Sequence, residues 1–159
     1  MEHNASMQPD WESQELGLNT RRPHIQPIPG IRYQPEPHIN SYDYLQLLYL
    51  TGVIEKYRNS EVEVITAMIK NSLIITARQD ALLVAAARYV TDYINTTFVA
   101  ELLVREDFRR AGIGMDLIKE IHKLHPNTNV CFSPTDMFNE YIPLGLEVVK
   151  FNAVLPSTV

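Results

Sequence analysis

Two arginines and two glycines stand close together between an apolar run and an amphipathic run of the sequence. Arg109 and Arg110 supply positive charge and hydrogen-bond donors, and Gly112 and Gly114 let a ligand approach the backbone closely because they have no Cβ atom. The amphipathic run begins at Ile113, so the loop leads into a predicted helix. The first N–H groups of a helix have no intrahelical partner, and the helix dipole favours an anion at that end. These residues therefore predict a loop that binds phosphate.

The residues after the loop argue against two common kinds of phosphate site. A P-loop would need Gly-Lys-Ser or Gly-Lys-Thr at the start of the helix, but Met115 and Asp116 follow Gly114. A dinucleotide-binding fingerprint would need a third glycine or alanine where Leu117 stands. It would also follow the first strand of the chain, whereas this loop follows about the third. Neither a nucleoside triphosphate nor a dinucleotide is favoured.

Two motifs in this chain resemble those of the GCN5-related N-acetyltransferases (GNAT). Residues 109–114 match, at each specified position, the loop Gln/Arg-x-x-Gly-x-Gly/Ala of that family's motif A. About thirty residues later, residues 141–146 resemble the family's Tyr-x-x-Leu-Gly-Phe, with Leu146 in place of the aromatic residue. The resemblance is good over residues 72–150, and a weaker part of it reaches back to Ser41. An ordinary basic turn before a helix is the alternative interpretation of the loop.

The resemblance implies acetyl-CoA as the acetyl donor and no metal. The pyrophosphate would lie on the backbone N–H groups of residues 110–114, and the pantetheine would pair with the strand edge at residues 102–104 as an added strand does. The cofactor-binding residues that this implies are Leu102, Leu103, Val104, Arg109, Arg110, Ala111, Gly112, Ile113 and Gly114.

Moving an acetyl group from a thioester to an amine needs three events. The amine must lose a proton, the oxyanion must be stabilised, and the leaving thiolate must be protonated. The resemblance gives the last role to Tyr141, whose reference pKa of about 10 exceeds the value of about 8.5 for a thiol. Glu101 is the candidate base, a backbone N–H near Leu103 is the candidate oxyanion donor, and Arg88 or Tyr89 could add electrostatic help. A packed tyrosine and a structural glutamate are the alternatives.

Hydrophobic periodicity predicts the elements that must position these residues. Ser41 and Ser60 are expected to cap two helices, and Val64 and Met68, with Ile65 as a further candidate, are expected to face inward on the second. The expected segments are helices over residues 41–52, 60–71, 113–124 and 133 to about 143, strands over residues 73–78, 82–90, 96–104 and 130–132, and one or two last strands over residues 147–155.

This order of elements predicts the α/β (α+β) class and the GNAT acyl-CoA N-acyltransferase fold, with a mixed, mostly antiparallel sheet flanked by helices. Residues 1–39 contain six prolines at positions 9, 23, 27, 29, 35 and 37 and show no sustained period. We expect an irregular or extended, proline-rich N-terminal arm over residues 1–39 and the acetyltransferase domain over residues 40–159. The arm is interpreted either as a cover for the active site or for the partner subunit of a homodimer, or as a simple tail.

The composition of the chain limits the classes of partner that it can have. The chain has 159 residues, of which 45% are hydrophobic, so it can build one domain with a core. The formal net charge of −5 argues against nucleic acid as the main partner and fits a cationic amine. No apolar run approaches the roughly 20 residues of a membrane helix, and the N-terminus lacks the features of a signal peptide. We expect a cytoplasmic protein without a membrane partner.

We therefore predict an acetyl-CoA-dependent N-acetyltransferase. It would transfer acetyl to a primary amine of a small molecule or peptide, by direct attack in a ternary complex. Residues 41–71 and the turn at residues 91–95 would bind the acceptor. One alternative is a catalytically weak acetyl-CoA sensor or interaction protein of the same fold. Another is an acetyltransferase toxin acting on charged transfer RNA, which the net charge opposes.

Overall fold

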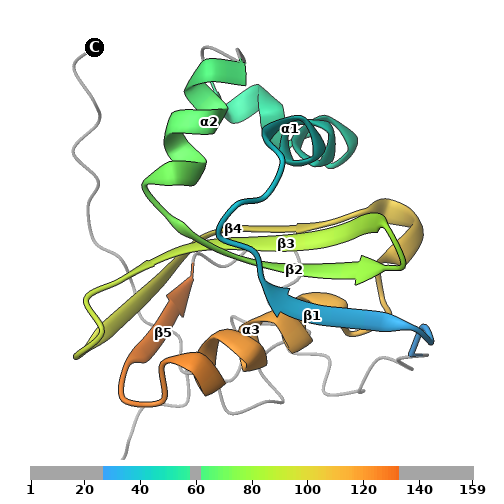
Figure 1. The fold of residues 1–159 in the computed structure, drawn as a ribbon. Coiled ribbons are helices and arrows are strands. Elements are labelled where there is room, and N and C mark those ends of the chain that lie inside the picture. The colour runs from blue at the N-terminus through green and yellow to red at the C-terminus, as the bar shows by residue number, and fades with distance from the viewer. Residues whose placement is uncertain (1–26, 58–61, 133–159) are drawn as a thin grey trace, which may run out of the picture. The chain divides into compact units, whose positions relative to one another are not determined.

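The computed structural model describes residues 27–57 and 62–132, which contain one five-stranded sheet with helices on both faces (Figure 1). The elements are β1 (Ile31–Pro35), α1 (Ser41–Leu50), η1 (Val53–Lys56), α2 (Val62–Lys70), β2 (Leu73–Gln79), β3 (Leu82–Thr91), β4 (Thr96–Val104), η2 (Glu106–Phe108), α3 (Ile113–Leu124) and β5 (Asn129–Phe132).

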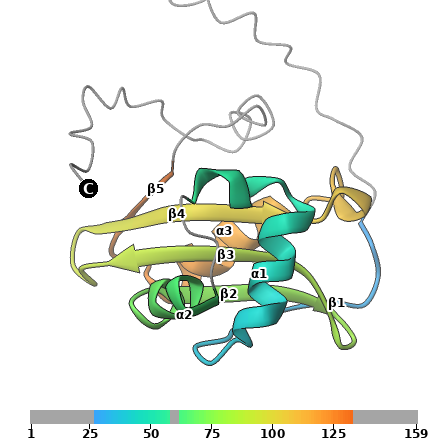
Figure 2. The same ribbon diagram turned by 90° about the horizontal axis from the view of Figure 1, so that it is seen from above.

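The strands lie in the order β1-β2-β3-β4-β5. The first four pair antiparallel, and β5 pairs parallel to β4. Helices α1 and α2 cover one face, and α3 covers the other (Figure 1). Figure 2 shows α1 lying across the strands with α2 beside it. The predicted mixed, mostly antiparallel sheet flanked by helices is confirmed.

Each face of the sheet carries its own core. On the α1 and α2 face, Tyr44 and Ile65 are fully buried and pack with Leu103 of β4. On the α3 face, Leu117 and Ile121 are fully buried against the sheet. Because these two residues are four positions apart, they lie on the same side of the helix, as the amphipathic pattern predicts.

Part of the predicted N-terminal arm forms a strand. Residues 31–35 are β1, which pairs antiparallel with β2, with Tyr33 opposite Ala77. Pro35 is the last residue of this strand, which is possible because an edge strand needs ladder hydrogen bonds on one side only. The sheet therefore begins before the predicted domain boundary at residue 40. The rest of the predicted arm, residues 1–26, lies outside the described residues.

Two details of the first helices also differ from the prediction. Asn40, not Ser41, caps α1: its side-chain oxygen accepts hydrogen bonds from the N–H groups of Tyr42 at 2.8 Å and Asp43 at 3.4 Å. In α2 the buried residues are Ile65 and Ile69. Val64, expected to face inward, is 41% exposed, and Met68 is half-buried, whereas Ile65, also expected on that side, is buried. The buried side of α2 is thus centred on Ile65 and Ile69, one position after Val64 and Met68.

Some predictions fall where the structure describes nothing. The capping residue Ser60, the predicted helix from residue 133, Tyr141 and the last strands all lie outside residues 27–57 and 62–132. Among the helices that are described, none combines the length and the apolar character needed to cross a membrane.

Candidate functional site

The loop between β4 and α3 contains two residues with left-handed backbone conformation. Arg110 has φ +61° and Gly112 has φ +81°, and Ala111 between them is buried. Glycine adopts a positive φ without steric cost, whereas arginine does not. The loop thus turns sharply at Gly112, directly before α3 begins at Ile113.

The N-terminus of α3 has backbone donors for which the described residues supply no partner. Gly112 occupies the N-cap position, and no side chain caps the helix there. The first helical hydrogen bond runs from the N–H of Asp116 to the carbonyl oxygen of Gly112, at 3.0 Å. The N–H groups of Ile113, Gly114 and Met115 precede that bond and point past the end of the helix. This end of α3 therefore offers three donors and a partial positive charge to an anion.

The arginines of the loop have different surroundings. Arg105 pairs with Asp107, with 3.1 Å between Nη2 and Oδ2, and lies over the ring of Phe108, 5.8 Å from its centroid. Arg109 is exposed and donates from Nε to the carbonyl oxygen of Val104 at 3.3 Å. Arg110 is exposed and makes no ion pair with any residue that the structure describes. Arg109 and Arg110 are thus the charges of the loop that a phosphate can reach.

Asp116 is the acidic side chain in the first turn of α3, and other residues engage its carboxylate. Asp116 accepts a hydrogen bond from the hydroxyl of Tyr33 in β1 at 3.1 Å and pairs with Lys119 at 3.4 Å. Burial, and then the neighbouring Asp116 charge, raise the pKa of Tyr33 well above its ordinary value, so the phenol stays a donor. The negative charge of Asp116 is thereby partly compensated beside the anion-binding end of the helix.

β4 presents an open backbone edge beside the loop. β5 pairs with β4 only from Thr96 to Val99, and no strand of the described part pairs with the same edge from Ala100 to Val104. The N–H of Arg105 bonds to the carbonyl of Val84 in β3, and alternate residues of an antiparallel ladder point the same way. Leu103 therefore bonds toward β3, while Leu102 and Val104 direct their backbone groups to the open edge.

A β-bulge at Ala100 decides which way the predicted base points. Arg88 pairs with Glu101 and Tyr89 with Val99, so Ala100 has no partner of its own in β3. As a result, Val99 lies in the core beneath α3, whereas Glu101 reaches Tyr44 on the α1 face. Bulges reorient side chains in this manner and often stand beside functional sites.

Glu101 lies in a buried polar cluster. Its Oε2 atom accepts hydrogen bonds from the hydroxyl of Tyr44 at 2.5 Å and from Nε of Arg88 at 3.0 Å. Arg88 in turn donates from Nη1 to the hydroxyl of Ser72 at 3.1 Å. The Glu101 side chain is only 6% exposed, and its Oε1 atom is buried without a hydrogen-bond partner among the described residues.

Burial in the cluster changes the pKa of both Glu101 and Tyr44. Burial raises the pKa of Glu101, and the hydrogen bond from Tyr44 and the charge of Lys56 oppose that rise. Burial, followed by the charge of Glu101, raises the pKa of Tyr44 far above its ordinary value. Tyr44 is therefore always the donor in this pair. A carboxyl group whose pKa moves toward neutrality is better suited to general base catalysis.

The two residues predicted to assist electrostatically lie on opposite faces of the sheet. Arg88 contacts Glu101, as described above, but the hydroxyl of Tyr89 lies 3.2 Å from Nε2 of His125 on the α3 side. The structure thus brings Arg88, and not Tyr89, to the predicted base. The sequence did not indicate Tyr44 as a partner of Glu101, nor Ser72 as a partner of Arg88. The one available signal was the spacing of Tyr44 with Leu47 and Leu48, which places all three on one side of a helix.

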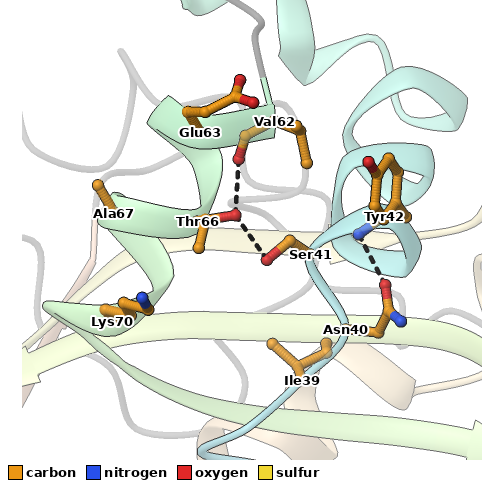
Figure 3. A pocket seen from close by; sticks show the side chains of 9 residues that line it. All are labelled: Ile39, Asn40, Ser41, Tyr42, Val62, Glu63, Thr66, Ala67 and Lys70. Atoms are coloured by element: carbon orange, nitrogen blue, oxygen red, sulfur yellow. Dashed lines mark hydrogen bonds between the residues drawn. The ribbon is translucent and has the colours of Figure 1, made fainter.

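A groove of about 660 Å³ lies between the start of α1 and α2, within the region predicted to bind the acceptor (Figure 3). Ser41 and Tyr42 line one side, and Glu63 and Lys70 line the other. The hydroxyls of Thr66 and Ser41 are hydrogen-bonded at 2.8 Å and so bridge the two helices. None of the predicted catalytic or cofactor-binding residues lines this groove, so we place the candidate site at the loop and the β4 edge instead.

A family model described as the acetyltransferase (GNAT) domain PanZ matches residues 50–141, which is more than half of the chain. The chain belongs to the GNAT superfamily. This GNAT domain therefore has a fold built for acetyl transfer, and the family generally uses acetyl-CoA. The matched residues include β4, the glycine loop and Tyr141, so the resemblance stated from the two motifs is confirmed.

Solved structures of other proteins share the GNAT fold. A GNAT-family acetyltransferase from Streptococcus pneumoniae is 21% identical with a TM-score of 0.67, and the match covers 81% of this chain and 99% of that one. A ribosomal-protein-alanine N-acetyltransferase from Brucella melitensis is 11% identical with a TM-score of 0.63 and the same coverages, 81% and 99%.

A third solved structure is an aminoglycoside acetyltransferase from an uncultured soil metagenomic sample. It is 15% identical with a TM-score of 0.58, and the match covers 80% of this chain and 97% of that one. At these identities the likeness establishes the fold alone. Among curated proteins, none matches this chain.

The described residues fit a CoA derivative. The uncapped N-terminus of α3, the left-handed turn at Gly112 and the exposed Arg109 and Arg110 suit a pyrophosphate. The open edge of β4 suits a chain of amides, which can pair with a strand. Within residues 27–57 and 62–132, no three His, Cys, Asp or Glu side chains gather as metal ligands would.

Proposed function

We propose that this GNAT domain is an acetyl-CoA-dependent N-acetyltransferase. It transfers acetyl to a primary amine of a small molecule or peptide, by direct attack in a ternary complex. The observation that carries the proposal is the uncapped, glycine-led N-terminus of α3 next to the open edge of β4. A cytoplasmic location and a homodimer stay predictions from the sequence.

The donor-binding residues are those of the loop and the strand edge. The N–H groups at the start of α3, with Arg109 and Arg110, hold the phosphates. The backbone groups of Leu102 and Val104 hold the amides of the pantetheine, and Leu103 contributes its buried side chain to the core beneath them. When bound, acetyl-CoA supplies the acetyl thioester.

The acceptor side needs a base and the leaving thiolate needs an acid. Glu101 is proposed to take the proton of the acceptor ammonium, since it is the acid of β4 that points toward the α1 face. Tyr141 is proposed to give a proton to the thiolate; this role rests on the motif that it shares with the family. The oxyanion donor is proposed to be an N–H of the open edge, that of Leu102 or Val104, because the N–H of Leu103 is directed to β3.

Calorimetric titration of acetyl-CoA and CoA tests the donor site. Gly112→Glu places bulk and negative charge where the phosphates would bind. Gly52→Glu is the matched control, because Gly52 also has a positive φ, +72°, and nothing lies within 4 Å of an added Cβ atom. Both substitutions place a side chain on a residue with positive φ, but only Gly112 stands at the proposed site.

The expected result is that the wild type and Gly52→Glu bind both compounds alike. Gly112→Glu is expected to lose on the order of tenfold or more in affinity, which corresponds to at least about 1.4 kcal/mol. Equal weakening in both variants would attribute the effect to backbone strain and would reject the site. Absence of binding to the wild type would reject the donor itself.

A panel of primary amines then tests the transfer. A polyamine, an aminoglycoside and a peptide with a free N-terminus are incubated with acetyl-CoA, and the release of free thiol is followed. Tyr141→Phe is expected to lower kcat with little change in the affinity for acetyl-CoA, because it removes only the proposed proton donor. Tight binding of acetyl-CoA without thiol release would instead support the second candidate.

That second candidate is a protein that binds acetyl-CoA as a sensor or in an interaction, with weak catalysis or none. One observation favours it: the Oε2 atom of Glu101 is already engaged by Arg88 and Tyr44. An oxygen that already accepts two hydrogen bonds has little capacity left to receive a proton from an acceptor amine.

A further inference from the structure

The carboxylate of Glu101 is held from two elements, and both contacts involve the same oxygen. Tyr44 of α1 and Arg88 of β3 donate to Oε2, at 2.5 Å and 3.0 Å. Arg88 is itself oriented by the hydroxyl of Ser72, which precedes β2. Two donors at one oxygen leave the carboxylate little freedom to rotate, so the position of Oε1 is fixed as well.

The other oxygen, Oε1, is buried and accepts no hydrogen bond from the described residues. A buried carboxylate oxygen is costly unless a donor satisfies it. The charged or titratable groups that act on this carboxyl are Tyr44 of α1, Arg88 of β3 and Lys56 of η1. The hydrogen bonds of Tyr44 and Arg88 go to Oε2, which leaves Oε1 as the acceptor atom for a further donor.

We propose that Tyr44 and Arg88 are positioning residues that occupy Oε2 of Glu101 and thereby make Oε1 the atom that receives the proton of the acceptor ammonium. This inference rests on the proposed function. It adds that the geometry of the base is set by α1 and β3, and that the ligand for Oε1 is a cationic amine, directly or through one water. Tyr44 and Arg88 themselves touch neither donor nor acceptor in this scheme.

The proton step balances as follows. An N–H bond of the ammonium breaks and an O–H bond forms at Oε1, which leaves an electron pair on nitrogen. That pair forms the C–N bond with the acetyl carbon, and the C–S pair leaves with sulfur. The nitrogen then loses a second proton, which balances the proton taken up by the thiolate through Tyr141. Glu101 returns its proton to solvent.

The test compares Tyr44→Phe with Tyr49→Phe. Both changes remove one hydroxyl from α1, but Tyr49 is 56% exposed, whereas Tyr44 is fully buried against Glu101. Phenylalanine keeps the ring of Tyr44, so the core of α1 is preserved. Two quantities are measured on each protein: the titration of Glu101 by carbon NMR of glutamate-labelled protein, assigned with Glu101→Gln, and the pH profile of thiol release with the amine panel.

Tyr44→Phe is expected to raise the pKa of Glu101 by on the order of one unit, because it removes a hydrogen bond to the ionised carboxylate. The base works when deprotonated, so the acid limb of kcat/KM should move to higher pH by the same amount. Tyr49→Phe should change neither quantity. Arg88→Lys, which keeps the charge but loses the planar Nε donor, should lower kcat without weakening acetyl-CoA binding.

The outcomes separate this inference from the proposed function. Thiol release by Tyr44→Phe with the Glu101 titration and the acid limb both unmoved would overturn the positioning role and leave the acetyltransferase proposal intact. If Tyr44→Phe lost stability but kept the pH profile of the wild type, the positioning role would likewise be rejected. Failure of the wild type to release thiol with any amine would overturn the proposed function, and this inference with it.

Discussion

At the scale of single residues, Arg78 joins several polar groups outside the candidate site. Its guanidinium holds Glu36 with two hydrogen bonds, at 2.9 Å and 2.7 Å, and also donates to the carbonyl of Ala81 at 3.0 Å. The hydroxyl of Thr76 donates to the same carboxylate at 2.7 Å. This bidentate geometry with the partly buried Arg78 holds the pKa of Glu36 below its usual range.

Glu36→Gln is expected to lower the free energy of unfolding at pH 7 by about 1–2 kcal/mol, because charge-assisted hydrogen bonds are lost. The pKa of Glu36 is lower in the folded than in the unfolded protein, so its contribution is present above the unfolded pKa and disappears as the pH falls through the folded one. The difference between the two proteins should therefore shrink in acid. Urea unfolding at several pH values measures it.

Asp107→Asn is the control for this change. It removes the charge from another carboxylate–arginine pair, with Arg105, but the Asp107 side chain is 58% exposed. Exposed pairs contribute little because water screens them. The unfolding midpoint of Asp107→Asn should stay close to that of the wild type. An equal loss in both variants would mean that net charge, and not the geometry at Arg78, determines the result.

Residue-scale predictions succeeded where the signal is local. The positions of the loop residues follow from spacing, and the loop does lead into α3 at Ile113. The partners of Glu101 could not be found in this way, since Tyr44 lies 57 positions away in the chain and meets it only after folding. The cap of α1 was misplaced by one residue because Asn40 and Ser41 are both good capping residues, and the backbone conformation decides between them.

At the scale of elements, α3 is held against the sheet by a stripe of buried side chains along one side of the helix. Leu117→Ala is expected to lower the free energy of unfolding by about 2–5 kcal/mol, since the side chain is fully buried and its removal leaves a cavity. Leu124→Ala in the same helix is the matched control: Leu124 is 46% exposed, and its loss should amount to less than about 1 kcal/mol. Thermal or urea unfolding of both variants decides whether the stripe ends before Leu124.

The helices and strands could be predicted where the hydrophobic pattern extends over many residues. β4 (Thr96–Val104) and α3 (Ile113–Leu124) have the predicted bounds, because nine and twelve residues suffice to establish a pattern. The bulge at Ala100 was not predictable. Strict alternation would put Val99 and Glu101 on one face, and only the pairing with β3 shows that they lie on opposite faces.

At the scale of the whole molecule, the missed strand β1 matters most. Five residues between prolines carry too short an alternation to predict a strand, yet the pairing with β2 extends over all of Ile31–Pro35. The N–H of Glu36 adds a hydrogen bond to the carbonyl of Ile74 at 2.9 Å. β1 thus covers the edge of β2 and, through Tyr33, reaches the first turn of α3.

A chain that begins at residue 40 is therefore expected to be less stable than one that begins at residue 27. The shorter chain loses the β1 ladder, the Tyr33–Asp116 hydrogen bond and the Glu36–Arg78 pair, so its unfolding free energy should fall by at least about 2 kcal/mol. Urea unfolding gives the free energy, and hydrogen exchange should show faster exchange in β2. Equal stability would restore the predicted boundary at residue 40.

The left-handed conformation of Arg110 implies a conflict between the stability of the protein and its affinity for acetyl-CoA. A non-glycine residue at φ +61° costs roughly 1 kcal/mol or more, so Arg110→Gly should raise the urea midpoint slightly by relieving that strain. The same change removes a cation from the proposed phosphate site and should weaken acetyl-CoA binding in calorimetry. Arg110→Gly would then stabilise the protein and weaken its binding of acetyl-CoA. Such a trade-off between stability and function is common where a strained residue contacts a ligand.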